Sequence, residues 1–156
     1  AYPPMDLIVN VQGDEPLIEP SVIDELIAPF ETDENLPMAT VMTRMDDAAE
    51  QLNPNNVKVI VDKLGYALYF SRSLVPYPRA SVVPVYKHIG IYAYRAGFLQ
   101  RYSEMDVSPL ETIESLEQLR VLWHGYPIAV EITQEAPAAG VDTQEDLDRV
   151  RVAFKA

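Results

Sequence analysis

Apolar and polar residues along the chain alternate in blocks that predict strands followed by helices. Residues 7–11 form a nearly continuous apolar run rich in β-branched side chains, which is typical of a strand buried in the middle of a parallel sheet. Pro20 and Ser21 then open a helix whose apolar positions fall at helical spacing, and Pro29 ends it. A strand, a loop and a helix in this order indicate an α/β layered domain.

The rest of the chain continues this alternation. Ser108 and Glu111 form a capping box, and the leucine stripe that follows predicts a single helix reaching Leu122. Thr143 and Asp146 cap a terminal helix. Three prolines within residues 71–84 exclude a long helix or a central strand and predict a loop. The remaining expected elements are a short helix at 46–52, strands at 38–43, 88–94 and 128–132, and a hairpin of residues 57–61 and 66–70.

Composition narrows the class of protein. With 156 residues, of which 48% are apolar, the chain has the size of one domain with a sizeable core. Its formal charge of -12, without a cluster of Lys or Arg, argues against nucleic-acid binding. The absence of cysteine excludes disulfides and thiolate metal sites, and no run of about 18 apolar residues predicts membrane insertion. We therefore expect a cytoplasmic protein.

Two aspartates stand where an α/β sheet places its ligands. Asp14 follows a glycine at the end of the first predicted strand, and Asp142 lies just before the capped terminal helix. Two carboxylates from separate loops, with water and phosphate in the other positions, suit Mg²⁺. Ordinary chemistry explains each residue as well, because Gly-Asp is a common turn and Asp-Thr-x-x-Asp is a common helix start.

Several other polar residues have both a functional and a structural interpretation. His88 heads a predicted strand and is suited to a sugar hydroxyl or carboxylate, although a structural histidine is more common. Arg72 and Arg79 bracket the proline-rich loop and offer bidentate forks to a carboxylate, whereas most loop arginines are simply solvated. Glu117 and Gln118 interrupt the leucine stripe, as residues on any exposed helix face do. Local patterns alone leave these alternatives open.

Five sequence blocks, taken together and in order, resemble the 3-deoxy-manno-octulosonate (Kdo) cytidylyltransferase family. They are IVNVQGDEP, YFSRSLVPYPR, YKHIGIYAYRAGFLQRY, SPLETIESLEQLRVLWHGYPI and GVDTQEDLDRVR, and they extend over essentially the whole chain. The resemblance implies transfer of CMP from CTP to Kdo, with release of pyrophosphate, for lipopolysaccharide biosynthesis. It also implies a homodimer and a three-layer α/β/α fold like that of nucleotide-diphospho-sugar transferases, with a mixed, mainly parallel sheet.

The resemblance also assigns roles by position. Asp14 and Asp142 correspond to the aspartates that bind the catalytic Mg²⁺. The residues that correspond to the Kdo-contacting set are Gln12, Arg72, Arg79, His88, Tyr92, Glu117 and Gln118. Residues 66–95 contain a candidate dimerisation arm. We expect residues 1–156 to be the carboxy-terminal part of a single cytidylyltransferase domain, because the opening strand and basic CTP-binding loop of the family do not appear in this sequence.

Because of that difference from the family pattern, we expect the 156-residue chain alone to bind CTP poorly and to form no CMP-Kdo. The loop between Arg72 and His88 is also short for the family, which makes the assignment of Arg79 less secure than that of Arg72. Two alternative functions remain: a non-catalytic fragment or dimerisation module, and a cytidylyltransferase for another acidic sugar. A pure interaction module would have no physical reason to keep Asp14 and Asp142 together with His88 and Gln118.

Overall fold

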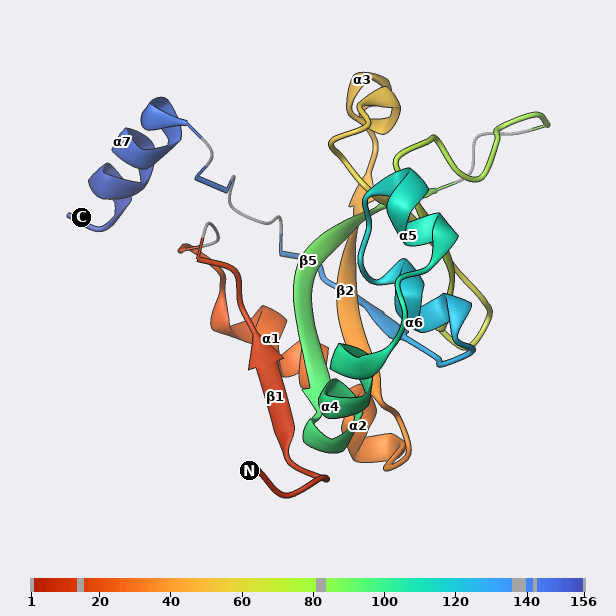
Figure 1. Cartoon of the computed structure of the whole chain (residues 1–156). Coiled ribbons are helices and arrows are strands. Elements are labelled where there is room, and N and C mark those ends of the chain that lie inside the picture. The colour runs from red at the N-terminus through yellow and green to blue at the C-terminus, as the bar shows by residue number, and fades with distance from the viewer. Residues whose placement is uncertain (1, 14–15, 81–83, 136–139, 142, 156) are drawn as a thin grey trace.

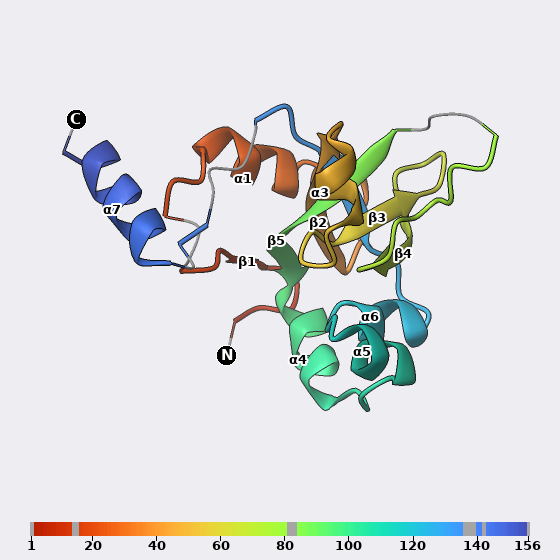
Figure 2. The ribbon, with the colours of Figure 1, turned by 90° about the horizontal axis from the view of Figure 1, so that it is seen from above.

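The computed structural model describes residues 2–13, 16–80, 84–135, 140–141 and 143–155. A mixed sheet lies between two layers of helices, with α1 on one face and α4, α5 and α6 on the other (Figures 1 and 2). The strands are β1 (Leu7–Asn10), β2 (Met38–Met45), β3 (Lys58–Val61), β4 (Ala67–Ser71), β5 (Val85–Arg95) and β6 (Ala129–Ile132). The helices are α1 (Pro20–Ile27), α2 (Pro29–Thr32), α3 (Ala48–Leu52), α4 (Ala96–Glu104), α5 (Pro109–Glu114), α6 (Leu119–Trp123) and α7 (Gln144–Ala153). The predicted three-layer α/β/α class is confirmed.

The expectation of a mainly parallel sheet is wrong for the described strands. The strand order is β4-β3-β5-β2-β6, with β1 also paired to β5. Only the β2–β6 pairing is parallel, while β5 is antiparallel to β1, β2 and β3, and β3 and β4 form an antiparallel hairpin. The short loop between β3 and β4 forces antiparallel pairing of that hairpin. For the strands that pair with β5, an apolar run reports burial but not direction.

The long strand β5 organises the sheet. One of its edges pairs with β2 along most of its length, and the other edge is shared by β3, opposite Tyr86 and Lys87, and β1, opposite residues 92–95. The central position predicted for residues 7–11 requires a strand on each side of β1, and it stays a prediction. β1 pairs with β5, no second strand pairs with it in the described part of the chain, and Val9 and Val11 are 36% and 38% exposed.

Two hydrophobic cores lie on opposite faces of the sheet, and β5 contributes to both because its side chains alternate between them. Tyr92 and Tyr94 belong to the core beneath α4, α5 and α6, where Leu119 is fully buried. Ile89, Ile91 and Ala93 belong to the core beneath α1 and α2. Consecutive residues of one strand thus hold both helical layers.

The single helix predicted from Ser108 to Leu122 is in fact two helices. The capping box is confirmed, but α5 ends at Glu114, and its C-cap Ser115 has a φ of 52° and a ψ of 51°, in the left-handed region. The stripe is broken as well, because Ile113 is 78% exposed. The turn at 115–118 between α5 and α6 holds both Glu117 and Gln118.

The other local predictions agree with the structure, with one omission. The hairpin, the terminal helix and the strands at 38–43, 88–94 and 128–132 are confirmed, and Gly65 takes a φ of 84° in the hairpin turn. Helix α4 was not predicted from the sequence, because its N-cap residue Arg95 provides no side-chain cap. None of the helices in the described part of the chain has the length and apolar character needed to cross a membrane.

Within the candidate arm at 66–95, β4 and β5 are integral strands of the sheet. The described part of the loop between them, residues 72–80 and 84, projects away from the sheet (Figure 1). Tyr77 in this loop is 82% exposed. The dimerisation role of the arm stays a prediction, and it now concerns this loop rather than the strands that flank it.

Candidate functional site

A row of aromatic rings lies on the sheet face beneath α4, α5 and α6. The His88 ring packs edge-on against Phe70, with 4.9 Å between centroids, and lies 5.5 Å from the ring of Tyr92. The row continues through Tyr94 to Tyr102 of α4, with centroid separations of 5.8 and 6.3 Å. The alternation of β5 places His88, Tyr92 and Tyr94 on the same face, so two of the predicted site residues are neighbours.

His88 is a buried neutral group. The residue is only 8% exposed, and desolvation lowers its pKa to about 3. Its Nε2 lies 2.9 Å from Oγ1 of Thr40 on the adjacent strand β2. Because the ring is uncharged at neutral pH, it is suited to hydrogen bonding rather than to an ion pair with a carboxylate.

Tyr92, Glu117 and Gln118 lie in the same region. Burial raises the pKa of Tyr92 well above its ordinary value, with further contributions from Tyr94 and Glu117. Glu117 also contributes to the raised pKa of Tyr102, which is about 12 and is due mainly to burial. Gln118 is buried, and its Nε2 has no hydrogen-bond partner among the described residues. A buried amide donor without a partner is costly for a fold, so a group that accepts its hydrogen bond would be stabilised there.

A cavity of about 580 Å³ adjoins this region, between β1 and the layer of α4, α5 and α6. Glu117 lines it together with Asn10 and Val11 at the end of β1. Arg120 and Glu111 form part of its wall and are joined by two short hydrogen bonds, 2.8 and 2.6 Å long. The Arg120 guanidinium lowers the pKa of the Glu111 carboxyl by hydrogen bonding, so this pair is ionised at neutral pH.

Sequence reasoning missed several of the cavity residues. Arg120 and Glu111 are nine residues apart across the α5–α6 turn, and a single continuous helix would not have brought them together in this way. Asn10 is the last residue of β1, and its polar side chain within an apolar run could have marked it as a candidate site residue. Tyr102 belongs to the helix α4 that was not predicted, and its hydroxyl donates a hydrogen bond to the Glu117 carbonyl.

Arg72 is extensively engaged within the chain. Its guanidinium donates hydrogen bonds to the carbonyl oxygens of Pro54, Glu114 and Ser115, at 3.0, 2.6 and 3.2 Å. Its backbone N–H donates to the Glu114 carboxylate at 2.9 Å, and Ser71 Oγ donates to the same carboxylate. Three of the five N–H donors of the guanidinium are therefore occupied by the end of α5 and a neighbouring turn.

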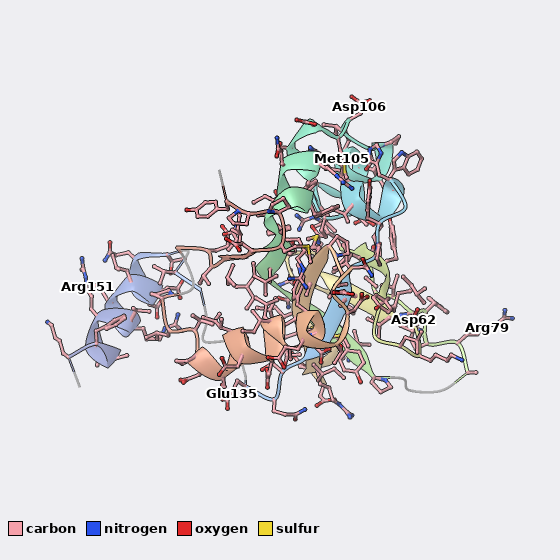
Figure 3. The ribbon with its side chains drawn as sticks, turned by 90° about the horizontal axis from the view of Figure 1, so that it is seen from below. Asp62, Arg79, Met105, Asp106, Glu135 and Arg151 are labelled. Atoms are coloured by element: carbon pink, nitrogen blue, oxygen red, sulfur yellow. The ribbon has the colours of Figure 1, made fainter. Side chains whose placement is uncertain are left out.

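Gln12 and Arg79 both lie on exposed segments of the chain. Gln12 is exposed after β1, and its Nε2 donates to Asn10 Oδ1 at 3.3 Å. Arg79 lies on the projecting loop, at the far side of the molecule from α7 (Figure 3). The structure thus brings His88, Tyr92, Glu117 and Gln118 together and leaves Gln12 and Arg79 on exposed segments.

The two predicted metal ligands, Asp14 and Asp142, lie outside the described residues. The segments that flank them, 11–13 after β1 and 140–141 before α7, lie on the same side of the sheet in both views (Figures 1 and 2). Among the described residues, no cluster of three His, Cys, Asp or Glu side chains could hold a metal. The Mg²⁺ assignment stays a prediction.

Comparison with known proteins gives a consistent result. The chain is 62% identical, over 98% of its length, to the 3-deoxy-manno-octulosonate cytidylyltransferase of Neisseria gonorrhoeae, and 55% identical, over 95%, to that of Herminiimonas arsenicoxydans. It spans 64% and 62% of the length of these two relatives.

Solved structures agree with the sequence comparison. CMP:2-keto-3-deoxy-manno-octonic acid synthetase complexed with CTP matches with a TM-score of 0.90 and 43% identity, over 96% of this chain and 62% of that chain. The 4-diphosphocytidyl-2C-methyl-D-erythritol synthase of Anaerococcus prevotii shares the fold, with a TM-score of 0.50 and 16% identity, over 96% of this chain and 59% of that chain. The family model described as Cytidylyltransferase matches residues 1–132, and the chain therefore belongs to the cytidylyltransferase family.

Proposed function

We propose that this chain is part of an enzyme that transfers CMP from CTP to Kdo, giving CMP-Kdo and pyrophosphate for lipopolysaccharide biosynthesis. The observation that carries the proposal is the match to a synthetase of this name complexed with CTP, whose TM-score of 0.90 extends over 96% of the chain. The chain spans 64% of the N. gonorrhoeae relative, so the activity is proposed for a protein that includes the remaining length.

The reaction sets a clear electrostatic requirement. The anomeric hydroxyl of Kdo attacks the α-phosphorus of CTP in line with the departing pyrophosphate, and no covalent enzyme intermediate is needed. Both reactants are anions, and the chain itself has a formal charge of -12. Local positive charge must therefore offset this repulsion, and Arg72 and Arg79 are the predicted cationic residues on the sugar side.

Asp14 and Asp142 are proposed to hold Mg²⁺. Two carboxylates fit the preference of this ion for a few protein oxygens together with water and phosphate. The positions of the flanking segments on one side of the sheet support the pairing. When bound, the ion would reduce the repulsion between the sugar and phosphate oxygens and favour deprotonation of the nucleophile.

The sugar is proposed to lie against the buried residues His88, Tyr92 and Gln118 and the exposed Glu117 beside them. Gln118 offers an unpartnered amide donor, and the neutral His88 ring offers a hydrogen bond without a charge. Glu117 lines the adjoining cavity and is suited to accept from sugar hydroxyls. Gln12, Arg72 and Arg79 complete the proposed contacts, and Arg72 has two guanidinium N–H groups left for the sugar carboxylate.

A cytoplasmic location and a homodimer are further parts of the proposal. The chain has no cysteine that an oxidising compartment would stabilise as a disulfide. The projecting loop that follows β4, with its exposed Tyr77, is the proposed dimer contact. Sedimentation of the protein, with and without Tyr77→Ser, tests the dimer separately from the activity.

The activity is tested by Mg²⁺-dependent pyrophosphate release from CTP, with Kdo or with sialic acid as the acceptor. A chain extended to the full length of the relatives is expected to use Kdo, while Asp14→Ala and Asp142→Ala are expected to lose activity. Asp24→Ala on the exposed face of α1 is the matched control and should retain it. Full activity of either Asp14→Ala or Asp142→Ala would refute the metal assignment, and a preference for sialic acid would refute the assignment of the sugar.

The 156-residue chain alone belongs in the same assay. We expect it to bind CTP poorly and to form no CMP-Kdo. Product formation by this chain would contradict that expectation while leaving the assignment of the reaction intact.

A further inference from the structure

We propose that Thr40 is a positioning residue that holds His88 in its Nε2–H tautomer, so that Nδ1 presents a hydrogen-bond acceptor to a hydroxyl of the sugar. The tautomer follows from contacts within the chain. The role toward the sugar rests on the proposed function, because it requires His88 to face the substrate.

Thr40 lies at an irregularity in the pairing of β2 with β5. Thr40 is opposite Tyr92, and the next residue, Val41, is opposite Ile89, so Gly90 and Ile91 have no opposing residue on β2. The Thr40 side chain is fully buried, and its Oγ1 lies 2.7 Å from the Ile91 carbonyl oxygen and 3.2 Å from that of Ile89. The hydroxyl thus provides a hydrogen bond where the strand ladder is interrupted.

The single proton of the Thr40 hydroxyl determines which atom donates in the hydrogen bond between Thr40 and His88. A threonine hydroxyl has one proton to donate, and a carbonyl oxygen can only accept. An oxygen pair separated by 2.7 Å, as Thr40 Oγ1 and Ile91 O are, requires a proton between the two atoms, because their lone pairs would otherwise repel. Thr40 therefore donates to Ile91, and the 2.9 Å contact with His88 must be an N–H of the ring donating to Oγ1.

The remaining ring nitrogen is consequently an acceptor. Burial keeps His88 neutral, so the ring carries one N–H, and Thr40 places it on Nε2. The only side-chain hydrogen bond of His88 among the described residues is the one at Nε2, and the flanking rings of Phe70 and Tyr92 lie 4.9 and 5.5 Å away, centroid to centroid. A lone pair in this position pairs with an O–H group and is repelled by a carboxylate.

Gln118 offers a hydrogen-bond donor, whereas His88 Nδ1 offers an acceptor. Its unpartnered Nε2 is a donor on the same side of the sheet, since Leu116 and Leu119 on either side of it belong to the core that includes Tyr92. A hydroxyl group both donates and accepts, whereas a carboxylate only accepts. The pairing of an acceptor at His88 with a donor at Gln118 therefore suits a polyhydroxylated ligand.

Nuclear magnetic resonance of protein labelled with ¹⁵N-histidine tests the tautomer directly, near pH 7 and without substrate. The chain contains two histidines, and Nε2 of His124 lies 3.0 Å from the Asp106 carbonyl oxygen. A carbonyl can only accept, so His124 is also expected to be protonated on Nε2, but independently of Thr40. His124 is therefore an internal control, and His88→Gln assigns the signals.

The wild type and Thr40→Ser are expected to show His88 protonated on Nε2 alone, whereas Thr40→Val should lose this preference and leave His124 unchanged. Protonation of wild-type His88 on Nδ1, or an unchanged preference in Thr40→Val, would overturn the assignment. Because the wild-type spectrum alone can refute it, the test does not depend on the folding of Thr40→Val.

Kinetics of the full-length enzyme then test the role toward the sugar. Thr40→Val should raise the KM for Kdo roughly three- to tenfold, the range expected for one neutral hydrogen bond, with little change in the KM for CTP. Thr40→Ser should restore the KM for Kdo. An unchanged KM for Kdo, together with the expected tautomer, would refute the positioning role. An enzyme without activity on Kdo would refute the proposed function but leave the tautomer assignment standing.

Discussion

Replacing His88 by glutamine should remove a specific part of the acid sensitivity of the fold. The folded pKa of about 3 lies below the ordinary value of 6.5, because burial disfavours the charged ring. Between these two pH values the unfolded chain binds a proton that the folded chain does not, so stability falls as the pH decreases. His88 therefore does not lower the free energy of unfolding above about pH 7, and it lowers it increasingly as the pH falls below that value.

The size of the effect follows from the two pKa values. One pKa unit corresponds to about 1.4 kcal/mol, so at pH 5 the wild type should have lost about 2 kcal/mol through His88 relative to pH 8. Glutamine does not titrate, and its amide can still donate to Thr40 Oγ1. The variant should therefore lose about 2 kcal/mol less than the wild type over this interval, even if it is less stable at both pH values.

Urea unfolding at pH 8 and pH 5 measures this difference. Contributions from the carboxylates cancel when the two proteins are compared, because these groups are shared. His124→Gln, the same substitution at an exposed position, is the matched control and should follow the wild type. Equal losses in the wild type and in His88→Gln would show that His88 is not a buried neutral group, and the tautomer argument would then lose its basis.

Three other predictions concern residues that support the site. Lys58→Met should destabilise the protein by roughly 2–4 kcal/mol, because the buried Nζ donates to the carbonyls of residues 53, 56 and 72; Lys63→Met in the exposed hairpin turn is the control for urea unfolding. A double-mutant cycle of Arg120→Met and Glu111→Gln should give a coupling of about 1–3 kcal/mol, since both side chains are mostly buried, and a coupling near zero would contradict the pair. Ser115→Gly should be about 1 kcal/mol more stable than Ser115→Ala in thermal unfolding, because alanine is strained at a φ of 52°; equal stability would argue against the left-handed turn.

The sequence was informative wherever structure depends on neighbours along the chain. The capping boxes that begin with Ser108 and Thr143 were predicted because their donors and acceptors are three residues apart. The left-handed residue Ser115 was not predicted, since serine rarely adopts that conformation and the leucine spacing suggested a continuous helix. Strand direction was missed for a similar reason, because apolar runs such as residues 7–11 do not encode the partner strand.

The candidate site was also predictable only in part, because its contacts join residues that are distant in the sequence. From its local sequence, His88 favoured a structural role, and its hydrogen-bond partner Thr40 lies 48 residues earlier in the chain. Tyr92 and Glu117 were assigned by resemblance, and only the folded chain shows that they share one electrostatic environment. Arg120 was missed because its partner Glu111 is reached across a turn that the sequence did not predict.

Arg72 holds the turn between α5 and α6 through hydrogen bonds to residues that are distant in the sequence. Its guanidinium holds the carbonyls of Glu114 and Ser115, at the point where α5 ends and the turn containing Glu117 and Gln118 begins. The Glu114 carboxylate also accepts from the Arg72 backbone N–H, so both the backbone and the side chain of Arg72 donate to the end of α5. Full transfer of the Arg72 fork to a sugar carboxylate would release the carbonyls that fix the turn. For the sugar site proposed above, these hydrogen bonds predict that Arg72 keeps its contacts and uses only its two remaining donors for the ligand. Arg72 would then act mainly through the position of Glu117 and Gln118.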